Sequence, residues 1–487
     1  MMKKLLLVIL LVILILLSVI LIRTVSFHSK QLQVDPVGAI SINTEQIADR
    51  LSKAIQFKTI SYQDSNQLDK NEFTGLLNYI ENTYPNIHAN LSREIVSDYS
   101  LLYKWTGEDE GLKPILLMSH LDVVPAESGS ENIWSYPPFS GALAKGFIWG
   151  RGTLDDKGGV FGILEAVEYL IDLGFKPKRT IYLAFGHDEE VGGMNGALEI
   201  ASFLKARKVE LEYVLDEGGF IAGGILPGVY SPVALVGIAE KGYLSVELSV
   251  EDEPGHSSMP PDQTAIGILS AAINKLEQNQ LPTNFTGPAR TMFEYVGPEL
   301  PFMKKMIFAN LWLFGKLVEG QLQQSPTTNA LIRTTTAATM FEAGEKENIL
   351  PREAKAVLNF RVLPGESTQD TMSHIRKTID DPRIVLTPSE HRTEPSFVSD
   401  IDSESFNIIQ TTIHQVFTDV IVAPWLLVAS TDSKHYLDIS DNVYRFRPYR
   451  IGPEDMSRFH GIDERISITD YEDTVRFFVQ ILKNSNN

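Results

Sequence analysis

The chain of 487 residues contains no cysteine. Disulfide bonds, thiolate catalysis and cysteine-based zinc sites are therefore excluded. The sequence also lacks an excess of positive charge, because 43 basic and 62 acidic side chains give a net charge of −19. Since phosphate backbones attract basic surfaces, this balance argues against a nucleic acid partner. No long internal repeat and no low-complexity tract is evident in the sequence.

One long apolar run stands at the N-terminus. Residues 5–22 are apolar apart from Ser18, with Lys3 and Lys4 before the run and Arg23 after it. A helix of this length, at about 1.5 Å per residue, covers about 27 Å and just crosses the core of a bilayer. A cleaved signal peptide is the alternative, but its apolar part is usually shorter and no small-residue cleavage site follows. We therefore predict a signal anchor with the catalytic domain on the non-cytoplasmic side of the membrane, and a secreted protein as the alternative.

A chain of this length exceeds one ordinary core, so we expect more than one domain. Strand-like runs at 114–119, 180–185 and 213–215 alternate with helical patterns at 159–173 and 193–204. This alternation predicts an α/β domain with a mostly parallel sheet and helices on both faces.

A different pattern begins near residue 240. Strand patterns at 244–250, 354–362 and 384–387, with helical patterns at 265–276 and 369–379, predict a β-α-β-β-α-β unit. We interpret it as a ferredoxin-like α+β lid inserted into the catalytic domain. The expected parts are 1–30 (signal anchor and tether), 45–239 (catalytic domain, first part), 240–393 (lid) and 394–487 (catalytic domain, second part).

Residues 301–318 of the lid are rich in large apolar side chains. The simpler interpretation is a helix packed into the lid. The alternative is an apolar surface that binds an acyl chain or the membrane.

Short polar clusters end the apolar runs of the first domain. Open α/β sheets place their sites at the carboxyl ends of the strands, so we expect these clusters to meet. Histidine and carboxylate ligands suit zinc or a similar divalent metal, and two such metals acidify a water and polarise a carbonyl. The pattern therefore predicts a two-metal hydrolase. The motifs are HLDVVP (120–125), GRGTLDDKGG (150–159), HDEEVGG (187–193), LDEGG (215–219), GHSSMP (255–260), NFRVLPG (359–365) and FHGIDERI (459–466).

Spacing adds detail at two of these motifs. Asp122 follows His120 by two residues, so on an extended chain both side chains share a face and the carboxylate can fix the imidazole tautomer. Glu189 and Glu190 are neighbours, and such pairs are usually solvated. Beside a metal, however, one can bind the ion while the other transfers protons.

Taken together, these motifs resemble the zinc peptidase family of carboxypeptidase S, the aminoacylases and succinyl-diaminopimelate desuccinylase. The resemblance runs from about residue 45 to the C-terminus and is closest to the branch of carboxypeptidase S and the N-fatty-acyl-amino acid synthase/hydrolases. It implies two zinc ions per subunit, with Co²⁺ or Mn²⁺ as substitutes. It further implies one ion on His120, Asp216 and Asp155, and the other on Glu190, His460 and Asp155.

The same resemblance implies roles for further residues. Glu189 is expected to be the general base and Asp122 the residue that supports the histidine ligand. His256 is expected to hydrogen-bond the oxyanion, in many members across a dimer interface. Arg361 and Asn329 are expected to bind a substrate carboxylate.

The expected function is hydrolysis of the amide bond of N-acyl amino acids, or of the C-terminal residue of short peptides. The expected partners are a substrate with a free carboxylate, the membrane through the N-terminal segment, and a second copy through the lid. A two-zinc aminopeptidase that binds a free α-amine is the alternative. A non-catalytic receptor is disfavoured, because every expected ligand and the base are present.

Overall fold

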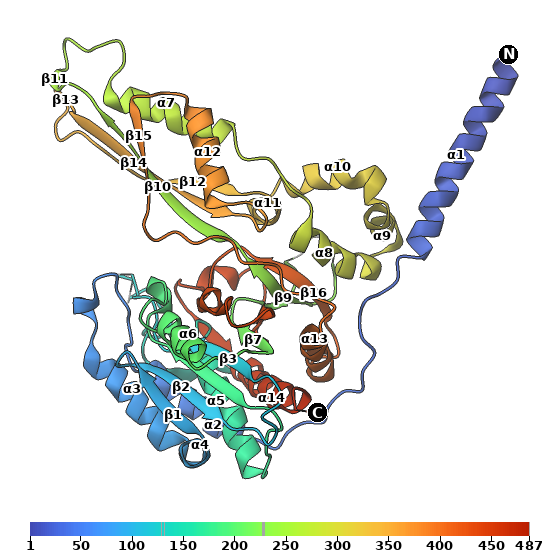
Figure 1. Cartoon of the computed structure of the whole chain (residues 1–487), viewed down its shortest axis with the longest axis vertical. Helices are drawn as coiled ribbons and strands as arrows, with labels where there is room; N and C mark the ends of the chain where they lie inside the picture. The colour runs from blue at the N-terminus through green and yellow to red at the C-terminus, as the bar shows by residue number, and fades with distance from the viewer. Residues whose placement is uncertain (128, 131, 226–228, 487) are drawn as a thin grey trace.

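A large mixed sheet forms the centre of the molecule (Figure 1). The computed structural model describes residues 1–487 except 128, 131, 226–228 and 487. The strand order is β1-β2-β6-β3-β7-β17-β9-β8-β18, and β16 pairs with β9. The strands are β1 (Ser92–Val96), β2 (Ser100–Trp105), β3 (Ile115–His120), β6 (Ile181–Gly186), β7 (Tyr213–Asp216), β8 (Phe220–Ala222), β9 (Val233–Glu240), β16 (Ile421–Leu427), β17 (Val443–Arg445) and β18 (Arg450–Ile451).

The centre of this sheet is parallel and its edge is antiparallel. Strand β3 pairs in parallel with both β6 and β7, and β7 pairs in parallel with β17. At the edge, β1 and β2 run antiparallel because a tight turn joins them, with positive φ at Ser97 (48°) and Asp98 (73°). The predicted parallel arrangement thus holds where the polar clusters lie.

Helices cover both faces of the sheet, as predicted. On β3, Leu117 packs into the core shared with α2 (Thr44–Ile55), α5 (Lys157–Asp172) and α14 (Ile468–Asn484). Its neighbours Leu116 and Met118 pack on the other face, in the core shared with α6 (Ala197–Ala206). Successive strand residues point to opposite faces, so both faces need apolar side chains and the strands are apolar throughout.

A second, antiparallel sheet has the order β12-β14-β10-β15. Helices α7 and α12 share a separate core with it. The chain order is the β-α-β-β-α-β order expected of the inserted unit, while the domain limits drawn from the sequence stay a prediction. The elements are β10 (Gly242–Glu251), α7 (Ala265–Gln278), β12 (Thr335–Ala343), β14 (Glu353–Val362), α12 (Thr368–Ile379) and β15 (Ile384–Pro388).

The apolar stretch 301–318 differs from the simpler expectation. It forms two helices, broken at Asn310, and the buried residues of the second helix, Val318 and Leu322, belong to the core of the large sheet, not to that of the second sheet. This placement follows from α8, which packs against β16 and precedes the two helices in the chain. The helices are α8 (Gly287–Val296), α9 (Phe302–Ala309), α10 (Leu311–Leu322) and α11 (Pro326–Ile332).

Helix α1 (Met2–Val25) projects away from the rest of the chain (Figure 1). It is long and apolar enough to cross a membrane, and nearly all of it is exposed. The segment after α1 is fixed more firmly than the flexible tether expected from the sequence. The Gln31 side chain donates to the backbone carbonyl of Val422 (3.0 Å) and accepts from its N–H (2.7 Å), which fixes the segment to β16.

Smaller elements complete the fold. A three-stranded sheet has the order β19-β5-β4, and β11 pairs with β13 beyond the second sheet. They are β4 (Ala142–Ala144), β5 (Phe147–Trp149), β11 (Gly255–His256), β13 (Ile349–Leu350), β19 (Arg465–Ser467), α3 (Lys70–Thr83), α4 (Pro85–Asn90) and α13 (Glu404–Val416).

Candidate metal centre

The neighbouring parallel strands β6, β3 and β7 bring polar residues to one edge of the large sheet. His120 is the last residue of β3, residues 188–190 follow β6, and Asp216 and Glu217 lie at the end of β7. Because parallel strands end at the same edge, these residues meet there, as the sequence predicts.

Asp155 lies between the two predicted histidine ligands. Its Oδ1 is 2.9 Å from His120 Nε2, and its Oδ2 is 3.0 Å from His460 Nε2. Burial opposes its ionisation, but hydrogen bonds from both histidines lower the pKa of Asp155. The peptide bond from Asp155 to Asp156 is cis. One carboxylate in contact with two imidazoles has the arrangement of a bridging ligand.

Each histidine also contacts a further carboxylate. His460 Nε2 is 3.1 Å from Glu190 Oε2, and His120 Nε2 is 3.4 Å from Glu217 Oε1. Within the part of the chain that the structure describes, these contacts give two groups of mutually close donor atoms, and both contain His120. They are His120, Asp155 and Glu190, and His120, Asp156 and Glu217.

The structure does not bring Asp216 into either group. Its carboxylate accepts a hydrogen bond from the backbone N–H of Ser433 (2.9 Å). Asp216 ends β7, and successive side chains of a strand point to opposite sides. The next residue, Glu217, therefore faces His120 where Asp216 was expected.

The carboxylates of the site lie close together, so their negative charges repel one another. Burial, and then the charge of Asp155, raise the pKa of both Glu190 and Glu217. Among the described residues, Glu190 Oε1 is buried without a hydrogen-bond partner. Buried carboxylates of this kind need compensating cations. Imidazole nitrogens and carboxylate oxygens are donors that zinc accepts, so the residues present fit a zinc centre.

Asp122 supports this centre from the buried side. Its backbone carbonyl oxygen is 3.0 Å and its carboxylate Oδ1 3.3 Å from His120 Nδ1. The carboxylate also accepts hydrogen bonds from the backbone N–H groups of Glu189 (3.1 Å) and Glu190 (3.2 Å) and from Ser61 Oγ (2.6 Å). One side chain thus fixes a histidine tautomer and the loop after β6.

A buried ion pair between Arg151 and Glu464 (2.6 Å) is a feature that sequence reasoning missed. Glu464 also accepts hydrogen bonds from the backbone N–H groups of Gly152 and Leu154, both at 2.9 Å, just before Asp155. Arg151 donates to the backbone carbonyl of His460 (2.9 Å). The pair therefore fixes the loop of the aspartate against the loop of the second histidine.

Arg447 is a second buried cation that was missed. Its Nη2 lies 3.0 Å from Asp156 Oδ2 and donates to Ser119 Oγ (2.7 Å). Because the guanidinium already pairs with Asp156, the neighbouring Asp155 is the better placed of the two aspartates to bind metal. Arg151 and Arg447 both lie in polar motifs or loops. No local sequence pattern distinguishes them from arginines that are exposed to solvent.

A cavity of about 330 Å³ opens beside the centre, a size typical of small-molecule sites. Glu189 lines it together with Asp155, Glu190, Glu217 and His460. Burial raises the pKa of Glu189 well above its usual value. Apolar side chains complete the wall, including Phe220, Trp425, Leu427 and Phe459.

The catalytic histidine and the substrate-binding residues predicted in the lid lie outside the described lining of this cavity. His256 is exposed on β11, which lies at the far end of the second sheet from the large one (Figure 1). Arg361 lies over the ring of Tyr243, 4.7 Å from its centroid, and Asn329 Oδ1 accepts a hydrogen bond from Arg333 Nε (3.1 Å). This single chain therefore brings most of the predicted metal ligands together but not the predicted lid residues.

The sequence profile of peptidase family M20/M25/M40 matches residues 116–484. The chain belongs to this family. It is 44% identical over 476 residues to a probable carboxypeptidase S-like 2 of Dictyostelium discoideum, covering 96% of this chain and 91% of the relative. It is 42% identical to the N-fatty-acyl-amino acid synthase/hydrolase PM20D1.1 of Danio rerio, covering 91% and 86%. Carboxypeptidase S of Saccharomyces cerevisiae is 32% identical, covering 90% and 84%.

Solved structures share the fold of this M20 chain. An M20 metallo-carboxypeptidase of Sulfolobus solfataricus matches with a TM-score of 0.63 and 17% identity, over 90% of this chain and 98% of that one. Human carnosine dipeptidase 1 matches with a TM-score of 0.62 and 15% identity, over 90% and 96%. The predicted fold class and the predicted class of enzyme, a metallohydrolase, are both confirmed.

Proposed function

We propose that this M20 enzyme is a two-zinc amidohydrolase that cleaves an amide bond next to a free carboxylate. Its substrates are N-acyl amino acids or short peptides cleaved at the C-terminus. The contact of Asp155 with both histidines is the observation that supports this proposal most directly. Relatives named for carboxypeptidase and for N-fatty-acyl-amino acid activity support the two substrate classes.

The proposed ligands are divided between two ions that share Asp155. His120 and Glu217 complete one set, and Glu190 and His460 complete the other. Glu217 takes the place expected for Asp216, because only the former faces His120. Three protein ligands would hold each ion, the number found in catalytic zinc sites, which keep a further position for water or substrate. When bound, the ions supply Lewis acidity to a water and to the substrate carbonyl.

Glu189 is the proposed general base. It lines the cavity beside the ligands, and its backbone is fixed by the hydrogen bond to Asp122. Glu189 can therefore take the proton of the attacking water and deliver it to the leaving nitrogen.

The residues of the predicted lid are proposed to bind the substrate and to stabilise the oxyanion. Arg361 and Asn329 are proposed to bind the carboxylate, which requires the second sheet to move towards the cavity. His256 is proposed to stabilise the oxyanion from a second copy of the chain, because β11 lies far from the metal centre of its own chain (Figure 1). Helix α1 is proposed to anchor the protein in a membrane, and N-terminal sequencing of the mature protein distinguishes this from a cleaved signal.

The test begins with the metal content of the full-length protein purified in zinc. We expect two ions per chain, loss of N-acyl amino acid hydrolysis on chelation, and recovery on adding zinc. Glu217→Gln is expected to retain about one ion, whereas the matched Asp216→Asn retains two. Hydrolysis that persists without metal contradicts the proposal. Cleavage of an amino-acid nitroanilide in place of the blocked substrate identifies an aminopeptidase instead.

A further inference from the structure

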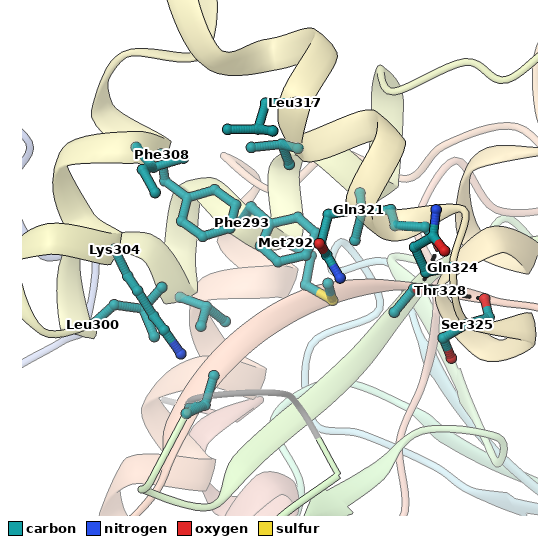
Figure 2. Close-up of a pocket in the computed structure, with 15 residues that line it drawn as sticks. Met292, Phe293, Leu300, Lys304, Phe308, Leu317, Gln321, Gln324, Ser325 and Thr328 are labelled. Atoms are coloured by element: carbon teal, nitrogen blue, oxygen red, sulfur yellow. Dashed lines mark hydrogen bonds between the residues drawn. The ribbon is translucent and has the colours of Figure 1, made fainter.

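The apolar segment 301–318 forms part of the wall of a second cavity, of about 480 Å³, between α8, α9, α10 and α11 (Figure 2). No described residue lines both this cavity and the one at the metal centre. The wall is mostly apolar. Phe293 of α8 and Phe308 of α9 stack within it, with ring centroids 4.7 Å apart. A partly open apolar cavity of this size suits a single hydrocarbon chain.

Polar groups lie at the rim of this apolar cavity. Lys304 of α9 and Gln321 of α10 line it, and Figure 2 shows both among the apolar side chains. Among the described residues, the ion pairs of α8, α9 and α10 join Lys30 and Arg290 to Glu294 and Lys316 to Glu319, and Lys304 takes part in none of them. An apolar cavity with an exposed cation at its rim matches a chain that carries a carboxylate.

The cavity also lies next to the end of the apolar N-terminal helix. Asn310, at the break between α9 and α10, donates to the backbone carbonyl of Ile20 and to Thr24 Oγ1, both at 3.2 Å. Arg23 Nε donates to the backbone carbonyl of Ala309 (3.3 Å). Large apolar side chains are exposed on the same two helices: Phe302, Met303, Trp312, Leu313 and Leu317. These contacts place the cavity at the surface of any membrane that α1 enters.

We propose that this cavity binds a long-chain carboxylate amphiphile taken up at the membrane surface. The acyl chain lies between α8 and α10, and Lys304 pairs with the carboxylate. A free fatty acid and a fatty-acyl amino acid share this chemistry. The proposal does not depend on hydrolysis at the metal centre, because the two cavities have separate walls.

The test uses full-length protein in phosphatidylcholine nanodiscs and a palmitic acid analogue that carries a photoreactive diazirine. Labelling is expected on cavity residues, and palmitate is expected to compete better than hexadecanol. Leu317→Glu places a negative charge at the cavity and should abolish most of the labelling. Its control is Leu313→Glu, which changes an exposed residue of the same helix outside the lining.

The charge of the rim is tested in the same way. Lys304→Gln should weaken palmitate binding up to about fivefold, the scale of an exposed ion pair, without changing binding of hexadecanol. Lys305→Gln, outside the lining, is the matched control and should bind normally. Competition by N-palmitoyl-glycine against palmitate identifies which of the two amphiphiles binds more tightly.

Equal labelling of all variants, or label spread over α1 and the outer faces of α9 and α10, would overturn the proposal and indicate partition into the bilayer alone. Hydrolysis of a short N-acetyl amino acid by Leu317→Glu should match the wild type. This control shows that the fold is intact. It also separates failure at this cavity from failure of the function proposed for the metal centre.

Discussion

The candidate metal centre has a buried side around His120 and an open side around His460. Different structural elements position the two histidines. His120 is 1% exposed at the end of a central strand, and Asp122 contacts its second ring nitrogen. The His460 side chain is 53% exposed on a loop, with a positive φ of 57°. The main chain of His460 accepts a hydrogen bond from Arg151, whereas its ring contacts the carboxylates of Asp155 and Glu190.

This difference shows how the centre is assembled. The buried side is built by neighbouring parallel strands of the large sheet. The open side needs a loop from beyond the inserted sheet, positioned by the pair of Arg151 and Glu464. We therefore expect changes on the buried side to affect the chemistry and the first ion, and changes on the open side to affect docking of that loop.

The largest effect is expected for Glu189→Gln, which removes the proposed base but keeps the shape of the residue. Loss of general base catalysis should lower kcat about 10²–10⁴-fold while both ions stay bound. The neighbouring Glu190→Gln is the matched control, because it should lose the ion on the open side. Near-normal kcat in the first variant would remove Glu189 from the mechanism.

A similar loss is expected for His256→Ala, although this residue is remote from the centre of its own chain. Removing an oxyanion donor typically lowers kcat about 10²–10³-fold, and metal content should not change. Mixing this variant with Glu189→Gln should restore activity, since a mixed dimer contains one complete site. If the mixture stays inactive while dimers form, His256 does not act across the interface.

The sequence predicts most residues on the buried side of the candidate metal centre, but fewer of the contacts on its open side. Apolar runs and polar clusters at their ends are local patterns, and they locate His120, Asp122 and Glu189 correctly at one sheet edge. The choice between Asp216 and Glu217 depends on side-chain direction at the end of a strand, which spacing alone does not settle.

Long-range pairing is harder to predict from sequence. Arg151 and Glu464 are 313 residues apart, and each looks like an ordinary surface charge in the sequence. The stretch 301–318 is evidently apolar, but its composition does not identify the surface it packs against. Its position depends on the packing of the preceding helix α8 against β16 and on the contact of Asn310 with Ile20 of α1, 290 residues away in the chain.

The open side is tested by Arg151→Met, which leaves Glu464 buried without its cation. Removing one partner of a buried ion pair costs about 3–5 kcal/mol of unfolding free energy. The double variant with Glu464→Gln should recover part of this loss, because the unpaired charge is then gone. Chemical denaturation measures both, and metal analysis should show weaker binding of the ion on His460. Equal stability of the single and double variants would show that the pair does not hold the two loops.

The buried side is tested by Asp122→Asn, and here the smallest effect is expected. The amide retains the volume but replaces one acceptor oxygen with an NH₂ donor, which then faces donors from Glu190 and Ser61. Loss of such a supporting carboxylate lowers metal affinity about 10–100-fold, and the ion on His120 should be affected first. Ser61→Ala is the control, because it removes a single hydrogen bond and leaves the carboxylate in place. Titration with a zinc chelator measures the two affinities separately. If the ion on His460 weakens first, the open side depends on Asp122 through the loop of Glu190, and the two sides are not independent.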